Sequence, residues 1–129
     1  MNKTWNPETV AAPLGTYSHC CEIPAGARML HIAGQVGVSP DGALKDGFEA
    51  QAEQTLRNII SILKANAMAP EDITKFGTYI VSREDLSLYF EIRNKVLGKI
   101  RPPGTLLVVS SLATTEMLIE VEAYAAKLD

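Results

Sequence analysis

Cysteine is scarce in this chain of 129 residues: the only two, Cys20 and Cys21, are adjacent. Neighbouring cysteines rarely reach the geometry of a relaxed disulfide, so we expect no disulfide scaffold and a reducing, cytoplasmic location. With His19 beside them, the two thiols are too cramped to ligate one zinc ion, and the sequence offers no second ligand cluster. We therefore expect no metal site and interpret both cysteines as packing residues.

Positive charge is not in excess. Lys and Arg number 12 against 15 Asp and Glu, which gives a formal net charge of −3. Proteins hold polyanions mainly through a basic field, and this composition does not supply one. We therefore expect no nucleic-acid partner.

Long apolar runs are missing too. A run such as Leu106–Val109 falls far short of the roughly 20 residues that cross a bilayer, so no membrane association is expected. Residues 1–13 contain one lysine with no apolar run after it, so we expect no secretory signal there.

No internal repeat and no linker rich in Gly, Ser or Pro divides the chain. Its length suits one domain, and a hydrophobic content of 47% is enough for a core. We therefore expect a single domain over residues 1–129, with Met1–Ala12 as a loosely structured lead-in.

Two amphipathic helices are predicted. Apolar residues recur at steps of three and four from Phe48 onward, and Pro70 cannot continue that helix, so its end is expected within Asn66–Met68. A second helix is expected over Leu86–Leu97, between an N-capping aspartate and a terminating glycine.

Strand-favouring residues fill much of the remaining chain. They predict five strands, over residues 16–23, 29–33, 74–82, 105–111 and 118–127. The resulting order, ββαβαββ, predicts an α+β fold in which two helices cover one face of a mixed sheet.

The last predicted strand carries two carboxylates on one face. Glu120 and Glu122 alternate with apolar residues, so both point to the same side of the sheet. A solvated face is the simpler interpretation, and a carboxylate that acts as a general base or holds a water molecule is the alternative. If both helices cover the other side, this face, with Tyr17, Tyr79 or Tyr124 on it, forms an oligomer surface or a cleft wall.

Other candidate features favour structural roles when taken alone. Arg93 follows Tyr89 by four residues; it is either a surface arginine or a planar fork for a carboxylate, and Arg101 has the same two interpretations. His19 and His31 are expected to pack on strand faces. The glycines of residues 34–37 lack the spacing of a dinucleotide-binding loop.

Five short motifs occur in order along the chain. They are Ala12-Pro13-Leu14-Gly15-Thr16-Tyr17, Leu30-His31-Ile32-Ala33-Gly34-Gln35, the segment Glu53–Ile59, the segment Glu71–Lys75, and Ile119-Glu120-Val121-Glu122-Ala123. Together they resemble the motifs of the YjgF/RidA family of small enamine and imine deaminases, over about Pro13 to Lys127.

This resemblance implies a chorismate-mutase-like protomer that forms homotrimers, with sheets facing inward and three clefts between subunits. Family members hydrolyse reactive enamines and imines to a keto acid and ammonia, without a metal or a cofactor. By motif position Glu120 would orient a water molecule and Tyr17 would line the cleft. The remaining substrate-binding candidates are Ala33, Gly34, Arg93, Gly104 and Thr105.

The sequence departs from the family pattern where the substrate carboxylate is bound. The arginine that members carry before the fifth strand is Gly104 here, the serine before Gly34 is Ala33, and an asparagine of the second helix falls at Arg93. Segment 101–107 instead resembles family branches that lack the catalytic arginine. Another cation would have to replace it; Arg93 is the best candidate and Arg101 the alternative.

Three functions are consistent with this pattern. The first is a trimeric imine or enamine deaminase of altered specificity, and the second is a ligand-binding or regulatory trimer that has lost the chemistry. Both predict a small-molecule partner with a carboxylate. The third and weakest is an endoribonuclease, which the net charge and the lack of a catalytic histidine pair disfavour.

Overall fold

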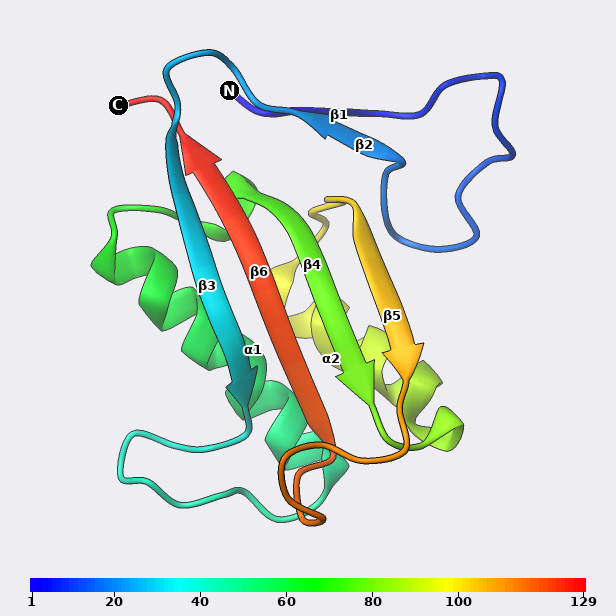
Figure 1. Cartoon of the computed structure of the whole chain (residues 1–129), viewed down its shortest axis with the longest axis vertical. Helices are drawn as coiled ribbons and strands as arrows, with labels where there is room; N and C mark the ends of the chain where they lie inside the picture. The colour runs from blue at the N-terminus through cyan, green and yellow to red at the C-terminus, as the bar shows by residue number, and fades with distance from the viewer.

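The computed structural model describes residues 1–129 and contains a four-stranded main sheet. Its strands lie in the order β3-β6-β4-β5 (Figure 1). β6 pairs antiparallel with both β3 and β4, whereas β4 and β5 run parallel, so the sheet is mixed. The strand bounds are Arg28–Val36 for β3, Ile73–Ile80 for β4, Gly104–Val108 for β5 and Ile119–Lys127 for β6.

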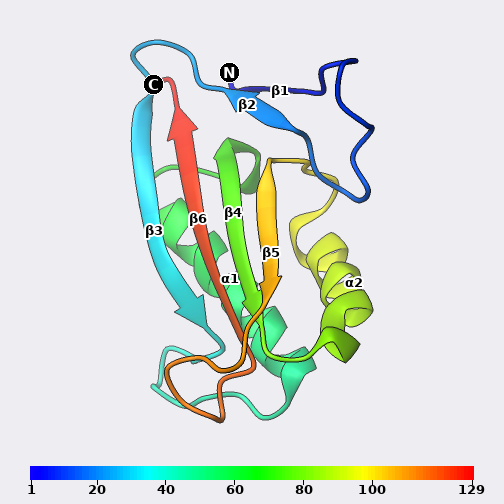
Figure 2. The same cartoon turned by 45° about the vertical axis from the view of Figure 1, so that its right-hand side comes forward.

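Both helices lie on the same face of this sheet, α1 (Phe48–Ala65) behind β3 and β6 and α2 (Leu86–Leu97) behind β4 and β5 (Figures 1 and 2). Short 3-10 turns, η1 (Pro70–Asp72) and η2 (Arg83–Asp85), precede β4 and α2. The predicted α+β fold with two helices on one sheet face is confirmed. Neither helix combines the length and apolar composition of a membrane span.

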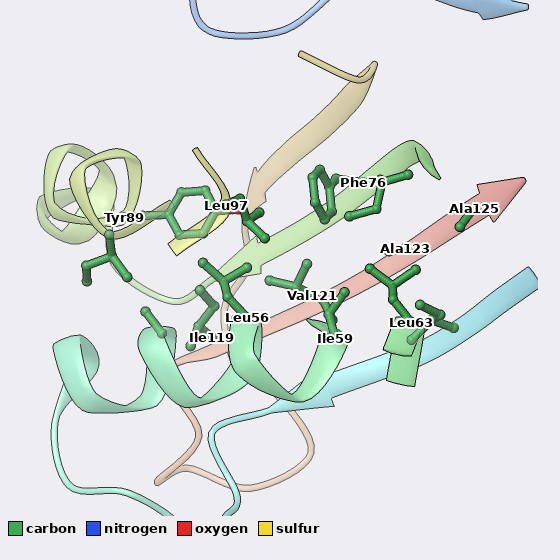
Figure 3. Packing of buried hydrophobic residues seen from close by; sticks show 14 of the residues in the cluster. Leu56, Ile59, Leu63, Phe76, Tyr89, Leu97, Ile119, Val121, Ala123 and Ala125 are labelled. Carbon is green, nitrogen blue, oxygen red and sulfur yellow. The ribbon is translucent and has the colours of Figure 1, made fainter. Parts of the chain in front are cut away.

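The core lies between α1, α2 and the covered sheet face. Alternate residues of β6 point into it, and small ones such as Ala123 and Ala125 leave room for the helices. Figure 3 shows the close packing of this layer, whose buried members include Leu56, Ile59, Leu63, Phe76, Tyr89, Leu97, Ile119 and Val121.

The N-terminal segment departs from the expected loose lead-in. Lys3–Trp5 forms β1, which pairs antiparallel with β2 (Cys20–Glu22) in a separate two-stranded sheet beyond the end of the main sheet (Figure 1). The strand expected over residues 16–23 is therefore shorter and does not join the main sheet. All three β1 residues are exposed, so no hydrophobic alternation marks this strand in the sequence.

A buried amide ties the first turn of α1 to two loops. The Gln51 side chain donates to the carbonyl oxygens of Lys45 at 3.1 Å and Glu116 at 3.0 Å, and accepts from the backbone N–H of Leu118 at 2.8 Å. It is 2% exposed. One side chain therefore fixes the loop that enters α1 and the loop that enters β6.

Gln51→Leu should lower the free energy of unfolding by about 2–4 kcal/mol, because it leaves three backbone groups without partners inside the protein. Denaturant titration of the variant measures this. Gln54→Leu is the control: that side chain donates only to Asn58 of its own helix, and its loss should cost under about 1 kcal/mol. Equal losses in both variants would contradict the role given to Gln51.

Candidate functional site

The uncovered face of the main sheet carries the predicted carboxylates. Because Ile119, Val121 and Ala123 are buried in the core, Glu120 and Glu122 project from the opposite side of β6. Both are half-buried, although no helix covers this face (Figure 1). The sequence prediction that they share one face is confirmed.

Two glycines explain how these side chains lie. A Cβ added to Gly34 would collide with the carboxylate of Glu120, and one added to Gly77 would come within 2.8 Å of Cγ of Glu122. Gly77 is the register partner of Glu122, and Gly34 lies in an irregularity of β3 between Ile32 and Gln35. Each glutamate therefore lies across the glycine of a neighbouring strand. Gly77 was not identified from the sequence, because its significance depends on strand register.

This face carries two carboxylates and also the exposed Lys75, which lies opposite Tyr124 in the sheet register. Neither glutamate takes part in an ion pair within the chain. The Tyr79 hydroxyl donates to Oε1 of Glu122 at 3.4 Å, and the Glu122 charge is the main cause that raises the pKa of Tyr79. Tyr124 lies alongside, with its ring edge-on to His31 at 5.0 Å between centroids.

A cavity of about 510 Å³, here called the outer cavity, is lined by the segment around β2 and by the first residues of β4 and β5. Tyr17, Gly104 and Thr105 line it, as do Cys20 and Cys21. Both thiols are free, and burial raises the pKa of Cys21, which disfavours the reactive thiolate. No group of three His, Cys, Asp or Glu side chains could hold a metal ion.

A second cavity of about 240 Å³, here called the Arg93 cavity, lies on the helix side of β5. Tyr17, Gly104 and Thr105 line it as well, so the two cavities adjoin along these residues. Its other wall is α2, from which Arg93 contributes its side chain; the residue is only 4% exposed. Arg101 is exposed and lines neither cavity.

Two contacts hold the Arg93 guanidinium. Its Nη2 donates to the Ile100 carbonyl oxygen at 3.3 Å, and its guanidinium carbon lies 5.6 Å from the centre of the Phe76 ring. Burial lowers the pKa of Arg93, though a guanidinium retains its charge at neutral pH. The sequence signal for burial was present, since Arg93 lies four residues from both Tyr89 and Leu97, which are buried on α2.

Within this single chain the predicted site residues form two groups. Glu120 pairs with Tyr79 in the sheet register, whereas Gly104 pairs with Phe76, three residues along β4 and one strand farther out. Standard sheet spacings put Glu120 on the order of 14 Å from Gly104. Ala33 and Gly34 lie on β3, on the Glu120 side of the sheet, whereas the second group consists of Tyr17, Arg93, Gly104 and Thr105.

A family profile described as Endoribonuclease L-PSP matches residues 8–127. The chain belongs to the YjgF/RidA family. A solved structure of a conserved Rid-family protein of unknown function, YyfB from Yersinia pestis, superposes with a TM-score of 0.85 at 32% identity, covering 98% of each chain.

Two curated proteins are also similar in sequence to this RidA-family chain. A RutC family protein from Aquifex aeolicus is 36% identical over 118 residues, which cover 89% of this chain and 91% of that protein. A 2-iminobutanoate/2-iminopropanoate deaminase from Salmonella typhimurium is 26% identical over 135 residues, covering 98% and 99%. These relationships support a RidA-like function.

The contact of Gly34 with Glu120 can be tested without an activity assay. Gly34→Ala should lower the free energy of unfolding by about 1–3 kcal/mol, because the new methyl displaces the Glu120 side chain. Glu120→Ala should remove most of that cost, a coupling of about 1 kcal/mol or more in a double-mutant cycle. The mismatched pair Gly34→Ala with Glu122→Ala should be additive. Additivity in the matched pair would show that the contact does not exist.

Proposed function

We propose that this protein is an imine or enamine deaminase that works in a cleft between subunits, with Glu120 as the group that activates water. The observation that carries the proposal is the Glu120 carboxylate itself: it lies against Gly34, has no ion-pair partner and faces the uncovered side of the sheet. Relatives described as 2-iminobutanoate/2-iminopropanoate deaminases support the reaction class.

The proposed reaction needs one positioned base and no cofactor. Glu120 accepts a proton from water as the water oxygen bonds to the electrophilic imine carbon, and returns the proton to the imine nitrogen. This gives a tetrahedral amino alcohol. The Glu120 carboxylate then transfers the hydroxyl proton of this amino alcohol to its nitrogen while the C–N bond breaks. The products are a keto acid and ammonia.

A second copy of the chain is part of this proposal. A small imino acid cannot contact both Glu120 and Gly104 of one protomer across about 14 Å. The open face also exposes large apolar side chains, Met29 and Leu107, each 49% exposed, that a second copy would cover. We therefore propose a homotrimer in which the cavity-lining residues Tyr17 and Gly104 of one subunit lie over the Glu120 of its neighbour.

The specificity should differ from that of members with the usual arginine. Gly104 offers no charge at the family's carboxylate-binding position, so the nearest cavity-lining cation is Arg93, on the helix side of β5. An anionic group bound there lies deeper than one bound by a side chain at position 104. Small imino acids should therefore be poor substrates.

The alternative is a ligand-binding or regulatory trimer that does no chemistry, favoured by the missing side chain at Gly104. An endoribonuclease is a weaker candidate, because Glu120 and Glu122, which have no ion-pair partner, would repel a phosphate backbone from the uncovered face. Binding of carboxylates without turnover of any imine would favour the ligand-binding trimer.

Glu120→Gln should slow imine hydrolysis by about 10²-fold or more, because the amide cannot accept the water proton. The assay generates imines in situ with an amino-acid oxidase or a pyridoxal-phosphate lyase and follows release of ammonia. Glu122→Gln, on the same face and strand, is the matched control and should stay within several-fold of the parent. A parent that accelerates no imine in a broad panel would overturn the proposal.

Gly104→Arg tests the altered specificity. An arginine there should accelerate hydrolysis of small substrates such as 2-iminopropanoate by roughly 10-fold or more, because it supplies a charge-assisted bond to their carboxylate. Gly104→Gln, long and polar but uncharged, controls for the added bulk. An arginine variant no faster than the glutamine variant would mean that Gly104 does not set the specificity.

A further inference from the structure

We propose that the Arg93 cavity is a binding site for the carboxylate of a ligand whose remaining part is apolar, with Arg93 Nη1 as its anion-binding group. This deepens the proposed function, on which it rests for the reaction, but the binding can be measured without turnover. It concerns the helix side of β5, away from the uncovered sheet face.

The guanidinium of Arg93 is a buried charge without a counterion. All three ion pairs of the protomer involve other residues, and Nη1 is a buried nitrogen with no hydrogen-bond partner. Leaving a buried donor and a buried charge unpaired is unfavourable, so an anion that reaches Nη1 is strongly stabilised. The Ile100 carbonyl and the Phe76 ring hold the group in place before a ligand arrives.

The walls around this charge are mostly apolar. The rings of Phe76, Tyr89 and Phe90 line the cavity together with Leu106. The Tyr89 hydroxyl is already engaged with the Thr78 hydroxyl at 3.2 Å, so its ring is what remains for a ligand. One cation within an aromatic wall is the arrangement expected for an apolar carboxylate rather than for a sugar or a phosphate-rich ligand.

Size limits the ligand. At about 30 Å³ for each water-sized group, a cavity of about 240 Å³ holds about eight such groups. That accommodates a carboxylate with a branched or aromatic side chain, whereas acetate would leave most of the apolar wall uncovered. Leu106 and the rings of Tyr89 and Phe90 on α2 form part of the wall that limits the ligand.

Gly104 gives the ligand its route. A Cβ at this position would lie 3.3 Å from the Phe76 carbonyl oxygen and 3.4 Å from the Phe76 Cβ, at the boundary between the two cavities. Without a side chain, the boundary stays open, and a bound ligand extends from Arg93 toward the outer cavity. The substitution that removes the family's arginine therefore also opens access to Arg93.

Binding should be measured by isothermal titration calorimetry on the full-length Glu120→Gln protein, with phenylacetate as probe. Phenylacetamide, which has the same shape without charge, and acetate, which lacks the ring, should each bind at least 10-fold more weakly. Equal binding of phenylacetate and phenylacetamide would overturn the proposal.

Arg93→Met, which keeps the length of the side chain and removes its charge, should weaken phenylacetate binding 10- to 100-fold. Arg101→Met is the matched control, because that arginine lines neither cavity, and it should bind like the parent. Unchanged binding in Arg93→Met, or loss only in Arg101→Met, would refute the site.

Phe90→Glu keeps the test decisive if Arg93→Met fails to fold. Phe90 is 37% exposed, so a glutamate is tolerated there, and its carboxylate should compete with phenylacetate for the guanidinium and lower the affinity at least 10-fold. Phenylacetate binding without hydrolysis of any imine by the parent would support the site and reject the proposed function. Imine hydrolysis that Arg93→Met leaves unchanged would do the reverse.

Discussion

The architecture rests on one constraint: two helices cover a four-stranded sheet on one face only. Side chains alternate between the two faces along β6, so each residue that points into the core places its neighbour on the uncovered face. Ile119 and Val121 are fully buried, and Glu120 projects from between them. The core therefore fixes the side of the sheet from which the carboxylate projects.

Missing side chains are as important here as those present. Gly34 and Gly77 leave the space that Glu120 and Glu122 occupy, so each carboxylate lies along the sheet over the glycine of a neighbouring strand. Gly104 brings neither a side chain nor a charge to the place where the outer cavity and the Arg93 cavity adjoin. In the proposed function these absences act together: the water-activating group stays where the family places it, while the anion-binding group moves behind β5.

Much of the fold could be predicted because its main signals are local. The structure confirms the bounds of α2, Leu86–Leu97, and ends α1 at Ala65, just before the predicted range, since periodicity and helix-ending residues mark both helices. β1 could not be predicted, because three exposed residues that pair only through the backbone leave no pattern. Strand register is also non-local, so the contacts of Gly34 and Gly77 with the glutamates appear only in the structure.

The sequence could predict which residues belong to the candidate site, but not that they form two separate groups within one chain. The spacing of Glu120 and Glu122 predicts their common face, and the spacing of Arg93 from Tyr89 could have indicated burial. No local pattern shows that β4 separates β6 from β5, or that Glu120 and Gly104 are three residues apart along the sheet. That separation is what makes a second copy necessary in the proposed mechanism.

The most direct test of this account is the imine hydrolysis rate of mixed oligomers, made by co-expressing Glu120→Gln and Arg93→Met chains at equal levels. If each site takes Glu120 from one copy and Arg93 from its neighbour, about one quarter of the sites in randomly mixed oligomers carry both parent residues, and activity returns to about that fraction. A site built within one copy never contains both, so mixed oligomers as slow as the two separate variants would contradict the account.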